Sequence, residues 1–152
     1  MKKLLSFIFV IFLLNVTCFS SGDGRQISDF ANPDWKLYET INGIEIYYKS
    51  EECHDLKKGM HKEFVLLKFV NTTEENLVIK WDNYLWYDGN CLTCIEDAEY
   101  KFSVQLSAKE SREGGCEYES ELSLKLFSRF LNYSDKPELT MFELANLKVL
   151  TK

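Results

Sequence analysis

The feature that most constrains the fold is a two-residue alternation of apolar and polar side chains in several short segments. The clearest example is "YKFSVQL" (residues 100–106), where Tyr100, Phe102, Val104 and Leu106 alternate with Lys101, Ser103 and Gln105. Successive side chains of a β-strand point to opposite faces, so this spacing predicts a strand with one buried and one solvated face. No long helical period interrupts the series, and the pattern predicts an all-β protein.

Two turn signals place further strands. Asn42-Gly43 lies inside "WKLYETINGIEIYYK" and predicts a hairpin, because both residues tolerate positive φ. The segment "EFVLLKFVNTTEENLVIKW" (residues 63–81) has a polar turn at 72–76 and predicts a central hairpin. The apolar rows expected to line one core are Val65, Leu67, Phe69; Leu77, Ile79, Trp81; and the row of residues 100–106.

The carboxyl-terminal part adds two strands. "ELSLKLF" aligns Leu122, Leu124 and Leu126, and "LTMFELANLKVL" changes parity near Ala145, which predicts a β-bulge. About seven short strands separated by turns predict an antiparallel β-sandwich that spans residues 35–152 as a single domain.

The amino terminus has the layout of a secretory signal peptide. Lys2 and Lys3 precede the apolar run "LLSFIFVIFLLNV", which is too short to cross a bilayer, and small residues follow it. We therefore assign residues 1–20 to a signal peptide, with cleavage before Ser21, and 21–34 to a flexible tether. Lipidation of Cys18 is the alternative, although "NVTC" is a poor lipobox.

The net charge of the chain limits the classes of partner that it can bind. Removing Lys2 and Lys3 with the leader leaves 16 basic and 24 acidic side chains, a formal charge of −8. An acidic surface repels phosphate backbones and anionic lipid, so we expect no nucleic-acid partner and membrane contact only through an N-terminal lipid. We expect a monomer that is periplasmic, secreted or anchored to the envelope.

A family resemblance agrees with this picture. The succession "DWKLYETINGIEIYYK", "CHD", "LLKFVNTTEENLVIKWDNYLWYDGNCLTC" and "GGC" after a signal sequence resembles short, uncharacterised exported proteins of Flavobacteria and related Bacteroidota. The resemblance implies an immunoglobulin-like sandwich and no function. The Cys…Trp…Cys spacing of true immunoglobulin domains is missing, because Trp81 precedes both Cys91 and Cys94.

Catalysis is not indicated. The only histidines are His54 and His61, and no nucleophile motif or glycine-rich phosphate loop accompanies them. His54 and Asp55 are neighbours, and adjacent side chains of an extended chain point apart. We therefore predict no enzyme activity, no cofactor and no metal.

Four cysteines are expected to form disulfides: Cys53, Cys91, Cys94 and Cys116. If 64–71 and 77–86 form a hairpin, Cys53 enters at the pole where the 91–94 pair leaves. This placement favours bonds from Cys53 to Cys91 and from Cys94 to Cys116. The runner-up closes the 91–94 ring and joins Cys53 to Cys116. A zinc site of these cysteines, with or without His54, is the alternative chemistry.

Binding is the function that the composition favours. Four aromatic residues fall off the inward parity or near loops and form a candidate surface: Tyr47, Tyr84, Trp86 and Tyr87. Such residues stack on sugars or anchor proteins, although they also fill cores. We expect an exported, non-catalytic module that binds a protein or glycan at the cell envelope. The alternatives are a thiol- or zinc-dependent protein and an inhibitor or immunity-type protein.

Overall fold

The computed structural model describes residues 24–26, 34–56, 58–95, 98–117 and 120–152. Within these ranges the chain forms strands and short 3₁₀ helices and no α-helix. The strands are β1 (Arg25–Gln26), β2 (Lys36–Ile41), β3 (Ile44–Asp55), β4 (Met60–Asn71), β5 (Leu77–Tyr87), β6 (Asn90–Cys91), β7 (Lys101–Leu106), β8 (Ser111–Glu113), β9 (Lys125–Phe130) and β10 (Leu139–Thr151). The 3₁₀ helices are η2 (Ala98–Tyr100) and η3 (Leu122–Leu124).

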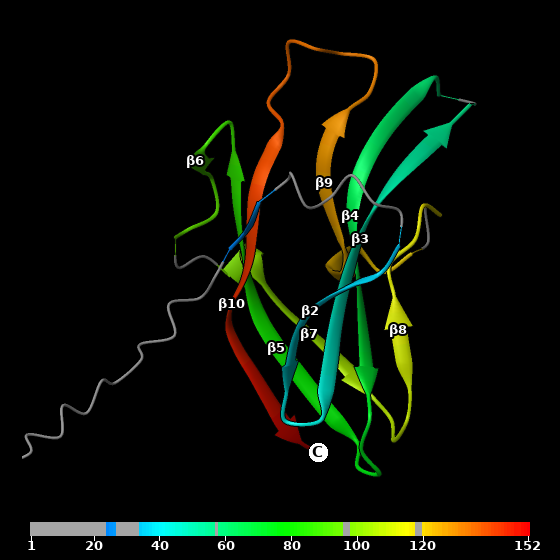
Figure 1. The fold of residues 1–152 in the computed structure, drawn as a ribbon, viewed down its shortest axis with the longest axis vertical. Helices are drawn as coiled ribbons and strands as arrows, with labels where there is room; N and C mark the ends of the chain where they lie inside the picture. Colours follow the sequence, from blue (N-terminus) through cyan, green and yellow to red (C-terminus); the bar gives the residue numbers. More distant parts are fainter. Residues whose placement is uncertain (1–23, 27–33, 57, 96–97, 118–119) are drawn as a thin grey trace, which may run out of the picture.

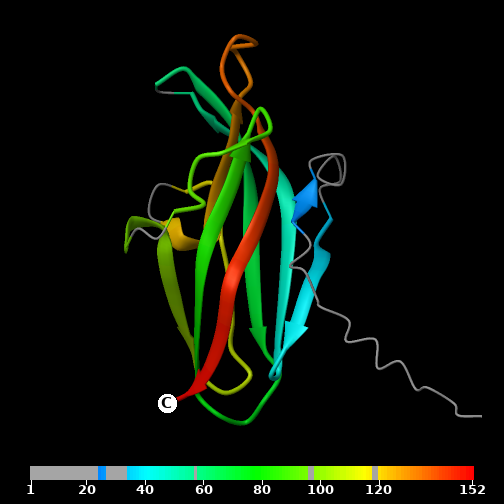
Figure 2. The same ribbon diagram turned by 90° about the vertical axis from the view of Figure 1, so that its left-hand side faces the viewer.

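Two antiparallel sheets carry the fold, and their strands run along the long axis of the molecule (Figures 1 and 2). In the first, the order is β1-β10-β5-β6, and β7 also pairs with β5. In the second, the order is β2-β3-β4-β8, and β9 also pairs with β4. The all-β prediction is confirmed, and seven of the described strands are six residues or longer.

The prediction that the strands on either side of the turn at 72–76 pair as a central hairpin is wrong. Strands β4 and β5 are consecutive, but they belong to different sheets, and the turn at 72–76 carries the chain from one sheet to the other. Asn71 organises this crossing: its side-chain amide donates to the carbonyls of Glu75 and Ser107, and its side-chain oxygen accepts from the Thr73 N–H. A polar turn therefore forms, as predicted, without joining paired strands.

The hairpin at Asn42-Gly43 is confirmed. Asn42 has a φ of 46° and Gly43 a φ of 80°, and the turn joins β2 to β3. A Cβ on Gly43 would lie 2.2 Å from the Thr73 methyl carbon. The position therefore requires glycine for space as well as for backbone conformation.

The core lies between the two sheets and contains the predicted apolar rows, apart from Tyr100, which belongs to η2 and is not part of the core. Val65, Leu67 and Phe69 face Leu77, Ile79 and Trp81 across it, and Val104 and Leu106 complete it from β7. Rings stack through the centre, with the centroids of Phe69 and Trp81 4.9 Å apart. The indole N–H of Trp81 donates to the Asn83 side chain at 2.8 Å, so its polar atom is satisfied inside the core.

Strand β10 contains the predicted bulge. Its register against β5 shifts between Ala145 and Lys148, and Asn146 takes a φ of 54° there. The Asn146 amide donates to the Asp82 carboxylate at 2.8 Å, which secures the extra residue to the neighbouring strand.

Two predicted boundaries differ from the structure. Arg25–Gln26 lie in the segment predicted as a tether, yet they form β1 and pair with β10. Leu122 does not align with Leu124 and Leu126 on a strand, because 122–124 form a 3₁₀ helix that leaves the Leu122 side chain exposed. The predicted signal peptide and Cys18 lie outside the described residues. Within the described ranges, no helix has the length and apolar character to cross a membrane.

The core assignment predicts a contrast between two neighbouring residues of β7. Val104 is 2% exposed, whereas the Gln105 side chain faces solvent and accepts from Lys152. Val104→Asp would bury an unpaired carboxylate and should lower the free energy of unfolding by at least about 3 kcal/mol. Gln105→Asp should change it by less than about 0.5 kcal/mol. Urea unfolding of both variants measures the difference, and equal losses would contradict the assignment.

Candidate functional site

The candidate site lies on the outer face of the β3–β4 hairpin. Ile46 and Tyr48 of β3 point into the core, so Cys53 points outward in the same alternation. In the antiparallel register Cys53 is opposite Lys62, which places Lys62 and Phe64 on this outer face as well. Leu66 follows on the same face and is 2% exposed, although it is not part of the core between the sheets. Something therefore covers the outer face of β4.

The chain leaves the sheet after β8 at Gly114 and returns at Leu124, and η3 on this path contacts β4. Strand β8 pairs with residues 68–70 of β4 and β9 with residues 62–66, so the chain departs from the sheet between them. The N–H of Gly114 donates to the carbonyl of Leu67 at 2.9 Å. A Cβ on Gly114 would lie 2.1 Å from the carbonyl oxygen of Leu124. Only glycine permits the departing and returning chains to approach this closely.

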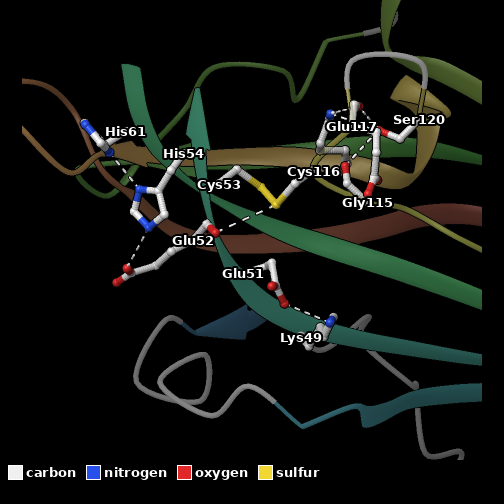
Figure 3. The surroundings of a disulfide bond; sticks show 11 residues. Lys49, Glu51, Glu52, Cys53, His54, His61, Gly115, Cys116, Glu117 and Ser120 are labelled. Atoms are coloured by element: carbon white, nitrogen blue, oxygen red, sulfur yellow. Dashed lines mark hydrogen bonds and ion pairs between the residues drawn. A yellow bond between two sulfur atoms is a disulfide. The ribbon is translucent and has the colours of Figure 1, made fainter. Parts of the chain in front are cut away.

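A disulfide from Cys53 to Cys116 attaches this segment to β3 (Figure 3). The second disulfide closes the short ring from Cys91 to Cys94. The preferred pairing, Cys53 with Cys91 and Cys94 with Cys116, is therefore wrong, and the runner-up is correct. The reason is the sheet assignment: β5 and β6 lie in one sheet and β3 in the other, so Cys53 and Cys91 share a pole but not a sheet.

The zinc alternative loses its ligands in this arrangement. Zinc binds cysteine as the thiolate, and all four of these cysteines are bonded in pairs. Across the described part of the chain, no group of three or more His, Cys, Asp or Glu side chains is placed to hold a metal ion.

A groove of about 830 Å³ lies beside the Cys53–Cys116 bond. One wall is the end of the β3–β4 hairpin, and the other is η3 with the first residue of β9. Two leucines at its edges are strongly exposed, Leu56 at 82% and Leu122 at 74%. The residues that line it are Cys53, His54, Asp55, Leu56, Lys58, Met60, Lys62, Phe64, Cys116, Leu122 and Lys125.

The groove is apolar at its base and positively charged at its edges. The Lys125 ammonium lies 5.2 Å from the centre of the Phe64 ring and donates to the Ser120 hydroxyl at 3.0 Å. Lys62 lies over the Phe130 ring at 5.5 Å, and Lys58 is 3.9 Å from the Asp55 carboxylate. Three lysines and one aspartate make the groove locally cationic, whereas the whole chain has a formal charge of −6. The groove therefore attracts anionic groups that the rest of the surface repels.

The four predicted aromatic residues do not form one surface. Tyr47 lies on β3 in the second sheet, and its hydroxyl donates to the Glu45 carboxylate at 2.6 Å. Tyr84 and Trp86 form an edge-to-face pair on β5 in the first sheet, with ring centroids 6.4 Å apart and both half-buried.

Tyr87 is on the inward parity, contrary to the expectation from sequence. It packs against the core and donates to the carbonyl of Phe127 at 2.5 Å. Burial raises the pKa of Tyr87 to about 12. A buried, hydrogen-bonded phenol of this kind joins the two sheets and is a structural residue.

The sequence analysis did not identify Met60, Lys62, Leu122 or Lys125 as site residues. The segments "GMHKEF" and "LSLK" place a lysine near apolar residues, but such short mixtures are common on solvated strands. They form a groove only because η3 is held against the β3–β4 hairpin. Comparisons of the chain with protein-family models, curated proteins and solved structures return no match.

The two disulfides should contribute unequally to stability. The Cys53–Cys116 bond spans 63 positions of sequence, and the Cys91–Cys94 bond spans three. Loop-closure entropy then predicts a loss of about 4 kcal/mol for the double variant C53S/C116S and about 1.5 kcal/mol for C91S/C94S. Denaturant unfolding of the oxidised proteins measures both losses. A larger loss from the short ring would contradict the proposed restraint of the 114–124 segment.

Proposed function

We propose that the protein is an exported, non-catalytic module that binds a protein partner through the groove beside Cys53–Cys116. The observation that carries the proposal is the combination of an apolar base, three lysines and two exposed leucines in one concave surface. Monomeric proteins rarely leave large aliphatic side chains grouped in a hollow unless something binds there. The partner should offer an extended segment with apolar and acidic side chains.

Location supports this role. The amino terminus has the composition of a signal peptide, and two disulfides are typical of an oxidising compartment outside the cytoplasm. Inside such a compartment, an inhibitor or immunity-type protein is one form that a binding module takes. We also propose kinship with exported Bacteroidota proteins and an immunoglobulin-like fold. Two facing antiparallel sheets favour that fold, whereas three consecutive strands in one sheet, β2 to β4, depart from the constant-type order.

A glycan is the second candidate ligand, and Tyr84 with Trp86 is the observation in its favour. Their rings are inclined by 77°, so they do not offer one flat platform to a sugar. The groove itself has few carboxylate or amide groups to bind hydroxyls. A protein segment is therefore the better fit to the surface that is most exposed.

Export predicts the mass of the mature protein. If residues 1–20 are removed, the exported chain begins at or near Ser21, and its intact mass is that of the remaining chain less four hydrogens. Mass spectrometry of protein recovered from the cell envelope measures this value. A retained Met1 would contradict removal of the signal peptide. A chain that begins at Cys18 and carries acyl groups would show that the protein is lipidated and not cleaved before Ser21.

The groove predicts where a partner is captured. A photoreactive residue in place of Leu122 should crosslink to one protein in the native envelope, and the same residue in place of exposed Leu150 should not. The double charge reversal K62E/K125E should weaken binding of the identified partner at least tenfold, about 1.4 kcal/mol.

The matched control is K101E/K148E, which changes the net charge equally at exposed positions of the first sheet. It should alter affinity less than twofold. Equal effects of the two charge reversals would contradict the groove as the binding site. Loss of binding through Trp86→Ala alone, together with binding to a glycan array, would favour the glycan instead.

A further inference from the structure

The two histidines of the chain face each other across the β3–β4 hairpin. His54 and His61 are directly opposite in the antiparallel register. Their Nδ1 atoms are 2.7 Å apart, with ring centroids at 4.9 Å and ring planes inclined by 58° (Figure 3). They lie on the opposite face of the hairpin from Cys53 and Lys62. Of the two, only His54 also lines the groove.

The contact between the rings requires one shared proton. At 2.7 Å, two lone pairs or two N–H groups would repel, so one Nδ1 donates and the other accepts. A divalent cation that replaces this proton gains both nitrogens as ligands at once. The two imidazoles are already held together by the strand pairing, so little ordering is needed on binding.

Glu52 orients one of the two rings. Its carboxylate oxygen is 3.6 Å from Nε2 of His54, on the side of the ring away from His61. A proton on Nε2 is favoured by the carboxylate and leaves the Nδ1 lone pair free to bind a metal. Histidine ligands in metal sites are commonly oriented by a carboxylate in this way.

The metal preference follows from the donor type. The 2.7 Å separation is that of a hydrogen bond, and ring centroids 4.9 Å apart place the two Nδ1 atoms nearly head-on, so the rings must tilt for one ion to bind both. Imidazole nitrogens bind copper(II) more tightly than zinc(II), as in the usual order of the divalent first-row metals. The His54 side chain is 46% exposed, so water can fill the remaining positions.

We infer that His54 and His61 form a binding site for a divalent transition metal, with copper(II) preferred over zinc(II). Two protein ligands and open positions make this a site of moderate affinity that exchanges its metal, not a structural centre. The inference does not rest on the proposed partner of the groove, although His54 also lines the groove.

Copper titration of purified protein without a polyhistidine tag tests the inference. We expect one copper(II) per chain, electron paramagnetic resonance features of two nitrogen donors, and affinity at least tenfold greater than for zinc(II). H54A and H61A should each weaken copper binding at least tenfold. Circular dichroism checks that both variants fold, as expected for side chains that are not part of the core.

Glu52 and Glu51 provide a matched pair of variants. E52Q should weaken copper binding about tenfold and keep the two-nitrogen signature, because Glu52 is a positioning residue. E51Q, whose side chain lies on the opposite face beside Lys49, should have no effect. Copper binding of unchanged affinity and signature in H54A/H61A would overturn the site, and equal affinity for zinc(II) would overturn the preference for copper(II).

Discussion

The backbone of β4 must be hydrogen-bonded along both edges, and the rest of the structure depends on how this is done. One edge is paired along its length with β3, whereas the other is divided between β8 and β9. Because two strands share that edge, the chain between them must leave the sheet at Gly114 and return at Leu124. The departing segment contains Cys116 and forms one wall of the groove. The candidate site is thus a consequence of hydrogen-bonding the backbone of β4 along both of its edges.

The β3–β4 hairpin extends beyond the core and presents two chemically different faces. The outer face, with Lys62 and Phe64, is cationic and apolar, and the inner parity at this end holds His54, His61 and their neighbouring acid Glu52. Alternation in a strand normally separates a buried face from a wet one. Past the end of the core both faces are accessible, so the same alternation places two candidate sites on one hairpin, and they share His54.

The two disulfides restrain the chain over different sequence separations. The Cys53–Cys116 bond connects distant parts of the chain and holds the segment that leaves the sheet at Gly114 against β3. The Cys91–Cys94 bond closes a local turn next to Trp86, where β6 pairs briefly with β5. Neither bond joins the two sheets. Their association depends on the apolar core and on bonds such as that from Leu144 N–H to the Tyr38 hydroxyl.

The sequence alone determined features that depend on neighbouring residues: the strand periods, the turn at Asn42-Gly43, the bulge near Ala145 and the identity of the disulfide cysteines. These follow from local conformational preference and from the parity of a pleated chain. Only the tertiary structure decided which strands pair, which cysteines bond, and that Leu122 belongs to a 3₁₀ helix beside a groove. A polar turn such as 72–76 serves equally well to join paired strands or to cross between sheets. The choice depends on burying every apolar row at once, which is a property of the whole chain and not of any segment.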